Sequence, residues 1–257
     1  VTKYPEVAYK NPYIDSLMNL NTTSGFAVDL YYDLDLVYES RPNVNMLNAY
    51  AEAVGVNIED CEVFVHKERK LGLYLPDDFI VLHAGTTDWV GRDWPYEKFV
   101  EIAKKLIKNG ENVVCVGKYT EKPIPGTVNL VADTTISQMS WIISQAKFFI
   151  GIDSLPMHIA QAHDIPGLAF FGSVKPETRI YSKNMRSITA RNVDCLGCHH
   201  DDLNPKPSTH SCRTGTLDCI NKLSVNEMYD KIISILRPLK LKSKILLSPK
   251  HGVNFII

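Results

Sequence analysis

The sequence lacks a long apolar run, a basic run and a strong net charge. No apolar stretch approaches the roughly 20 residues that a membrane-spanning helix needs. The formal net charge is −1 over 257 residues, so the chain has no general positive field that would attract nucleic acid. These absences argue against an integral membrane protein and against a nucleic-acid-binding protein. Any phosphate that the protein binds must be met by a few local groups.

The first residues also lack the features of a targeting segment. Residues 1–5 contain no positively charged stem that leads into an apolar core, and we therefore expect no signal peptide. The hydrophobic fraction of 45% and the charged fraction of 22% are typical of a globular protein with a sizeable core. We expect a cytoplasmic location, with the inner face of the membrane as an alternative site.

Three parts of the chain differ in their pattern. Residues 1–76 combine an apolar run at 25–32, which predicts a strand, with helical spacing at 44–55. Residues 77–240 alternate short apolar segments with amphipathic ones, and their last helix is expected to end before Pro238. Residues 241–257 form a tail that contains lysines. We therefore expect a partial N-terminal α/β domain at 1–76, a larger domain at 77–240 and a C-terminal tail.

The larger domain is predicted to be a doubly wound α/β domain. Its expected strands lie at 79–84, 112–117, 128–131, 148–151 and 167–172. Because these strands are apolar throughout and alternate with helices, they belong in a parallel sheet that is covered on both faces. Ligands bind such sheets at the carboxyl ends of the strands, so the loops that follow the strands form the expected site.

A carboxylate, a hydroxyl and a histidine follow the fourth expected strand. Asp153 and Ser154 come directly after it, and a helix is expected to begin near Pro156 with His158 one turn inside. The free N–H groups and partial positive charge at the start of a helix suit a phosphate. These residues alone are equally compatible with a structural role, in which Ser154 caps the helix and Asp153 stabilises its dipole.

The loop after the first expected strand combines hydroxyl groups with a guanidinium. Thr86, Thr87 and Arg92 lie in this loop, before a helix expected at 96–108. Backbone amides, hydroxyls and one guanidinium can together hold a diphosphate. A turn-rich surface loop is the alternative interpretation.

Taken together, these segments resemble glycosyltransferase family 9, the family of the lipopolysaccharide heptosyltransferases. The resemblance covers about residues 79–236, and more weakly residues 1–75. It rests on HAGT at 83–86, GRDWP at 91–95, FIGIDSLPMHIA at 149–160, IPGLAFFG at 165–172 and NPYID at 11–15. The resemblance implies a GT-B fold, in which two Rossmann-like domains face each other across the active site. This chain would then hold a complete C-terminal Rossmann-like domain and part of the N-terminal one.

The resemblance also implies a reaction and a set of roles. The donor would be a nucleoside-diphosphate sugar, and a heptose or hexose would be transferred with inversion to a glycan or a protein, as in lipopolysaccharide biosynthesis. The implied donor-binding residues are Asp153, Ser154 and His158 at the diphosphate and sugar, Thr86, Thr87 and Arg92 at the diphosphate, and Glu121 at the nucleoside. No catalytic metal is implied.

Two departures from the family bear on activity. The catalytic base of the family is an aspartate in the first strand–loop of the N-terminal domain, and no residue of this chain corresponds to it. Leu155 stands where the family usually has glycine just before the helix. A catalytically incomplete nucleotide-sugar-binding module is therefore one alternative to an active transferase. A GT-B-fold sugar epimerase, with a different set of carboxylates and histidines, is a second alternative.

Four of the six cysteines lie close together in the sequence, at Cys195, Cys198, Cys212 and Cys219. A Cys-x2-Cys pair is typical of the first half of a structural zinc site. The segment between the second and third cysteines is polar and proline-rich, so a metal or disulfides would supply the order that a core cannot. The resembled family often carries a comparable segment here. We expect a structural zinc or iron site, with disulfides or reduced thiols as alternatives.

Overall fold

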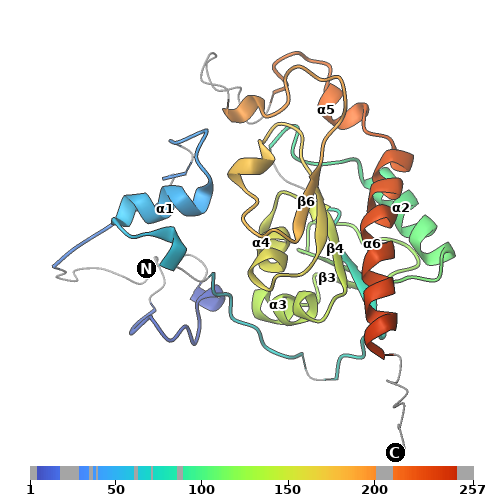
Figure 1. The fold of residues 1–257 in the computed structure, drawn as a ribbon, viewed down its shortest axis with the longest axis horizontal. Coiled ribbons are helices and arrows are strands. Elements are labelled where there is room, and N and C mark those ends of the chain that lie inside the picture. Colours follow the sequence, from blue (N-terminus) through green and yellow to red (C-terminus); the bar gives the residue numbers. More distant parts are fainter. Residues whose placement is uncertain are drawn as a thin grey trace, which may run out of the picture.

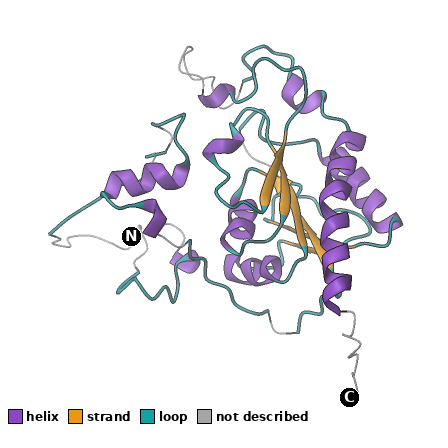
Figure 2. Ribbon diagram, in the orientation of Figure 1, coloured by secondary structure: helices purple, strands orange, loops and turns teal. Residues whose placement is uncertain are grey.

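The largest part of the structure is a six-stranded sheet with helices on both faces (Figures 1 and 2). The structure is a computed structural model. The residues that it describes are 5–17, 29–34, 37–38, 40–60, 63–70, 72–85, 89–200 and 211–247. None of the helices among these residues is long and apolar enough to cross a membrane.

All neighbouring strands of the sheet are parallel. The strands are β1 (Phe79–Leu82), β2 (Asn112–Gly117), β3 (Val128–Val131), β4 (Phe148–Ile152), β5 (Gly167–Phe170) and β6 (Met185–Ile188). Their order in the sheet is β3-β2-β1-β4-β5-β6, the order of a doubly wound dinucleotide-binding sheet. The direction of winding reverses between β1 and β4. The predicted doubly wound α/β domain is therefore confirmed, and the loops after β1 and β4 meet at its switch point.

The described residues form six α-helices, four of which cover the two faces of the sheet. The helices are α1 (Met46–Val54), α2 (Tyr96–Lys108), α3 (Ile136–Ser144), α4 (Leu155–Ala162), α5 (Asp218–Asn221) and α6 (Val225–Leu247). Short 3-10 helices are η1 (Pro5–Val7), η3 (Ile58–Asp60), η4 (Pro176–Thr178) and η5 (Cys198–His200). Helices α2 and α6 pack on one face of the sheet, and α3 and α4 pack on the other (Figure 1).

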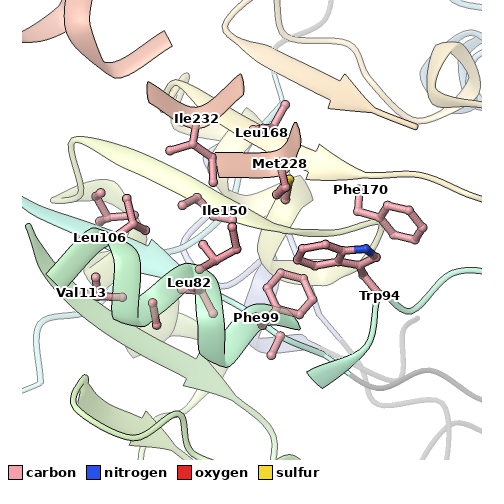
Figure 3. Packing of buried hydrophobic residues seen from close by; sticks show 14 of the residues in the cluster. Leu82, Trp94, Phe99, Leu106, Val113, Ile150, Leu168, Phe170, Met228 and Ile232 are labelled. Carbon is pink, nitrogen blue, oxygen red and sulfur yellow. The ribbon is translucent and has the colours of Figure 1, made fainter. Parts of the chain in front are cut away.

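The core has two halves because successive side chains of a strand point to opposite faces. In β1, Ile80 and Leu82 pack toward α2 and α6, whereas Phe79 and Val81 pack toward α3 and α4. Figure 3 shows the first half, where Leu82 lies among side chains from α2 and α6. All four side chains of β1 are buried, which explains why the strand is apolar throughout instead of alternating.

The N-terminal part of the chain packs against the helices on the α3 and α4 side. Ser137 of α3 donates a hydrogen bond to the carbonyl of Glu6 at 3.3 Å. The amide Nδ2 of Asn45, the residue that caps α1, donates to the carbonyls of Glu177 and Ile180, both at 2.9 Å. These bonds attach α1 to the loop after β5. The predicted domain limits at 76 and 240 stay predictions.

Three elements differ from the sequence prediction. The strand β6 was not predicted, because it is short and only Met185 in it is fully buried. The strand predicted at 25–32 is not formed at 29–32, where Leu30 is 68% exposed, and residues 25–28 lie outside the described residues. Helix α6 continues through Pro238 to Leu247, although a proline inside a helix removes one backbone hydrogen bond.

Truncation of a core side chain should destabilise the sheet. Leu82 is 0% exposed, so Leu82→Ala is expected to lower the free energy of unfolding by about 2–5 kcal/mol. Leu155→Ala makes the same change at a side chain that is 42% exposed, and it should cost no more than about 0.5 kcal/mol. Urea denaturation followed by circular dichroism measures both. Equal losses for the two variants would contradict the assigned core.

Candidate functional site

The loops that follow β1, β4 and β5 bring charged side chains together at the switch point of the sheet. Arg92 lies in the loop after β1, Asp153 directly follows β4, and His158 is in the first turns of α4. Arg179 follows η4, in the loop after β5. We call these four side chains the Asp153 cluster. The position matches the place where doubly wound sheets bind their ligands.

The carboxylate of Asp153 is the centre of this cluster, and its side chain is 1% exposed. Nη2 of Arg92 lies 2.9 Å from Oδ2 and donates a hydrogen bond to the backbone carbonyl of Asp153, also at 2.9 Å. Nε of Arg179 lies 3.8 Å from Oδ2, and Nε2 of His158 lies 3.7 Å from Oδ1. One buried carboxylate thus faces two guanidiniums and an imidazole.

The charges of the Asp153 cluster do not cancel. Burial by itself would raise the pKa of Asp153, but His158 and the positive charges of Arg92 and Arg179 outweigh burial and hold that pKa below its usual range. The carboxylate is therefore ionised at neutral pH. Because it supplies one negative charge to two guanidiniums, the cluster keeps an excess of positive charge.

Several polar atoms of the cluster are buried without a hydrogen bond. Nε of Arg92, Nδ1 of His158 and both carboxylate oxygens of Asp153 have no hydrogen-bond partner among the described residues. The contact between Arg92 and the Asp153 carboxylate is therefore close, but it lacks the alignment of a hydrogen bond. Buried polar atoms without partners are rare in folded proteins, and each calls for an explanation such as bound water or a ligand.

Ser154 stands at the N-cap position of α4, but its hydroxyl does not cap the helix. The Oγ atom donates to the carbonyl of Ile152 at 3.3 Å and lies 3.1 Å from Nδ1 of His83. On the other side of the ring, Nε2 of His83 lies 3.2 Å from Oε2 of Glu121. Capping by the Ser154 side chain, one of the two interpretations of this segment, is therefore wrong.

The contacts of His83 join the ends of three neighbouring strands. His83 directly follows β1, Ser154 lies after β4, and Glu121 lies after β2. The side chains of His83 and Glu121 are 5% and 8% exposed and Ser154 is half-buried, so most of the Ser154–His83–Glu121 chain is buried beside the Asp153 cluster. The two ring nitrogens of His83 thus contact the hydroxyl on one side and the carboxylate on the other.

The predicted site residues fall into three groups. Arg92, Asp153 and His158 meet in the Asp153 cluster, and Ser154 and Glu121 lie in the adjoining chain through His83. Thr86 and Thr87 lie outside the described residues. The structure thus assembles five of the seven side chains at one edge of the sheet. Their role in donor binding stays a prediction.

Arg179 and His83 also belong to this site, although the sequence pattern did not single them out. His83 follows β1, and Arg179 follows η4 in the loop after β5. Their positions after strands, at the carboxyl edge of the sheet, are the feature of the sequence that could have identified them. Arg179 is 4% exposed, and its guanidinium carbon lies 4.5 Å from the ring centre of Tyr38. This cation–π contact places the N-terminal part of the chain directly beside the Asp153 cluster.

The four clustered cysteines line one small cavity. Its volume is about 10 Å³, and its walls include Cys195, Cys198, Cys212 and Cys219 together with the loop at 90–91. All four thiols are free. Within the part of the chain that the structure describes, no three Cys, His, Asp or Glu side chains are arranged to hold a metal ion as they stand. The sequence thus predicted the convergence of the thiols, and the metal stays a prediction.

Comparison with known proteins links this chain and its fold to one family. The sequence model of glycosyltransferase family 9 (heptosyltransferase) matches residues 44–206, which is more than half of the chain. The chain is 27% identical over 174 residues to lipopolysaccharide heptosyltransferase 3 of Escherichia coli K12. That match covers 61% of this chain and 49% of the relative, so the chain spans about half the length of the curated relative.

Solved structures share the fold over most of the chain. The iron-containing dodecameric glycosyltransferase TibC of enterotoxigenic E. coli matches 77% of this chain and 54% of its own chain, with a TM-score of 0.65 and 16% identity. TibC in complex with ADP-D-β-D-heptose gives a TM-score of 0.63 at 17% identity, with coverage of 77% and 55%. E. coli ADP-heptose lipopolysaccharide heptosyltransferase II matches 77% of this chain and 63% of its own, with a TM-score of 0.54 and 16% identity.

Removal of the Asp153 charge should destabilise the protein in a pH-dependent way. Asp153→Asn leaves Arg92 and Arg179 without their shared carboxylate, which is expected to cost about 3–5 kcal/mol at pH 7. Because the folded protein lowers the pKa of Asp153, the wild-type advantage is complete above the unfolded pKa of about 3.9 and is lost as the pH falls through the folded pKa. Urea denaturation of both proteins between pH 7 and pH 3 measures this difference. A difference that stays constant down to pH 3 would show that the carboxylate charge is not its source.

Proposed function

This chain belongs to glycosyltransferase family 9, and from that premise we propose that it binds a nucleoside-diphosphate sugar at the Asp153 cluster and acts in sugar transfer. The sugar is a heptose or a hexose, and the acceptor is a glycan or a protein. The Asp153 cluster would face the diphosphate. Because the chain spans about half of its curated relative, the reaction of the whole protein is part of this proposal.

The observation that carries the proposal is the excess positive charge at the switch point. Two guanidiniums share the single carboxylate of Asp153, so a diphosphate group that approaches them adds the negative charge that the cluster needs. The start of α4 lies beside this cluster and is not capped by the Ser154 side chain, so its partial positive charge also favours an anion. The same groups would stabilise the nucleoside diphosphate as it leaves.

Both carboxylates at the site are already engaged, which points to the location of the catalytic base. Asp153 is held by Arg92, Arg179 and His158, and Glu121 is paired with His83. Inverting transfer needs a base that deprotonates the acceptor on the side opposite the leaving diphosphate. We therefore assign the donor half of the reaction to these residues and place the base on the facing, N-terminal side. The contact of Tyr38 with Arg179 marks that side.

Glu121 and Leu155 are the proposed contacts for the remaining parts of the donor. The carboxylate of Glu121 lies after β2 and is held by His83, where an acceptor oxygen suits the hydroxyl groups of a ribose. Leu155 is the first residue of α4 and is 42% exposed, beside the proposed place of the sugar. A heptose donor is the first to be tested, because the relatives named above are heptosyltransferases.

We also propose that Cys195, Cys198, Cys212 and Cys219 hold a structural zinc or iron ion. Four thiols around one cavity fit such an ion in the type and number of ligands. Four protein ligands leave no open position, so the ion would order the segment and take no part in the reaction. The free thiols of the described residues suit a reducing compartment, which supports a cytoplasmic location as part of the proposal.

The first test of the proposed function is donor binding. ADP and ADP-heptose, then other nucleoside diphosphates and their sugars, are titrated into the protein by calorimetry. Arg92→Ala is expected to weaken binding roughly tenfold or more because it removes a charged hydrogen-bond donor, and Arg92→Lys should restore part of it. Arg191→Ala is the matched control, since the Arg191 side chain is 84% exposed. Equal affinities of the Arg92→Ala variant and the wild type would remove Arg92 from the site.

Turnover is then measured as release of the nucleoside diphosphate in the presence of glycan and protein acceptors. Release that depends on the acceptor supports a transferase. Binding without release would favour the catalytically incomplete binding module, and binding of no nucleotide at all would overturn the proposed function.

The proposed metal is tested by elemental analysis of the purified protein. About one zinc or iron per chain is expected, and Cys198→Ser should reduce that content strongly and lower the melting temperature. Cys115→Ser is the matched control, because Cys115 is a buried thiol of β2 outside the cysteine cavity. A folded, metal-free wild-type preparation would rule out the metal.

A further inference from the structure

We propose that Trp89 is a positioning residue, which fixes Arg92 for the donor diphosphate and connects it to the cysteine-containing segment 195–199. This inference rests on the proposed function, because it concerns how the donor site is held in place. Trp89 would touch neither the donor nor the acceptor. Its effect would reach the donor only through the guanidinium of Arg92.

The indole of Trp89 contacts both Arg92 and His199. The guanidinium carbon of Arg92 is 4.9 Å from the centre of the Trp89 ring, in a cation–π contact. The ring of His199 meets the Trp89 ring edge-on, with a distance between centres of 5.4 Å and an interplanar angle of 60°. Arg92 is thus held at two points, by Trp89 and by Asp153.

Backbone hydrogen bonds connect the same two segments. Ser173 accepts a bond from the amide of His199 at 2.9 Å, and the amide of Ser173 donates to the carbonyl of Gly91 at 2.9 Å. The Ser173 hydroxyl also donates to the carbonyl of Val90 at 3.0 Å. The loop after β5 therefore links the cysteine segment to the residue next to Arg92.

Two glycines make this close contact possible. Gly91 has a φ of 87°, which is strained for any residue with a side chain, and a Cβ atom there would lie 2.7 Å from Cβ of Ser173. A Cβ atom on Gly172 would collide with the carbonyl oxygen of Gly91 and lie 3.3 Å from Sγ of Cys219. The loop before Arg92 therefore packs directly on the cysteine cavity, whose walls include Val90 and Gly91.

These contacts predict that the cysteine segment and the donor site are coupled. A change that shifts residues 195–199, such as loss of a thiol or of a metal, would move His199 and Ser173. Both residues contact the loop at 89–91, so Arg92 would lose its fixed position relative to Asp153. The result would be weaker donor binding without unfolding of the sheet, since the residues of the loop at 89–91 are not part of the hydrophobic core.

The test compares the nucleotide affinity of Trp89→Ala and Trp89→Phe with that of the wild-type protein, by calorimetry with ADP. Trp89→Ala is expected to weaken binding roughly 3- to 30-fold, the range of one cation–π contact, and Trp89→Phe should restore most of it. Trp141→Ala is the matched control: Trp141 of α3 also faces an arginine, with the guanidinium carbon of Arg69 at 5.6 Å from its ring, but lies outside the site. The affinity of the Trp141→Ala variant for ADP should equal that of the wild-type protein.

A double-mutant cycle separates positioning through Arg92 from a general structural effect. In the Arg92→Ala background, Trp89→Ala should change the affinity for ADP by less than about twofold, because the residue that Trp89 positions is already absent. His199→Ala should weaken binding in the wild-type background and have no further effect in the Trp89→Ala background. Far-ultraviolet circular dichroism confirms that each variant is folded.

Each outcome decides between the two proposals. If the wild-type protein binds ADP and Trp89→Ala binds equally well, or if the two losses simply add, the positioning role of Trp89 is wrong and the proposed function stands. If the wild-type protein binds no nucleotide, the proposed function and the inference both fall.

Discussion

The site depends on one buried carboxylate that two arginines share. Asp153 is removed from water at the end of β4, and an ionised group in that position is stable only with charged partners close by. Its partners come from the loops after β1 and β5, the neighbours of β4 in the sheet. The ion pairs therefore hold three adjacent loops at fixed positions. Arg92 and Arg179 carry like charges, and they stay close together because both contact this carboxylate.

Under the proposed function, the two sides of the site would have different tasks. The sheet side supplies positive charge and the start of a helix, which suit a leaving diphosphate. The two carboxylates described there, Asp153 and Glu121, already contact the arginines and His83, respectively. In the proposed reaction, the complementary task of activating an acceptor would belong to the opposite side. Tyr38 on Arg179 and Asn45 on the loop after β5 show that the N-terminal part of the chain reaches that side.

The cysteine segment has a structural connection to the Asp153 cluster. It folds back on the loop after β5, and that loop in turn supports the loop before Arg92. Gly91 and Gly172 allow the three backbones to approach each other closely. A structural cluster at this place would therefore do more than order a polar segment. It would also hold the guanidinium of Arg92, the proposed donor contact, in place through Trp89 and His199.

The sequence by itself determined β1 to β5 and the helices between them, but not β6, and it also determined the edge of the sheet at which the Asp153 cluster lies. Apolar strands buried on both faces and amphipathic helices leave a local pattern, and Asp153 and Arg92 stand in loops that such a pattern places at one edge. A residue-level resemblance supplied the family. The resemblance did not show that the Ser154 side chain leaves its helix uncapped. The hydroxyl of Ser154 instead contacts His83, which is 71 positions away in the chain.

The tertiary structure alone decided the partners within the site. Arg92 and Asp153 are 61 positions apart, and the two meet only because β1 lies beside β4 in the sheet. Arg179 joins them because β5 is the other neighbour of β4, and Trp89 meets His199 because the chain after β6 returns to the loop after β1. Local periodicity records which face of an element is buried, but it carries no information about which strands become neighbours. The pairing of charges across strands therefore appears only in the folded protein.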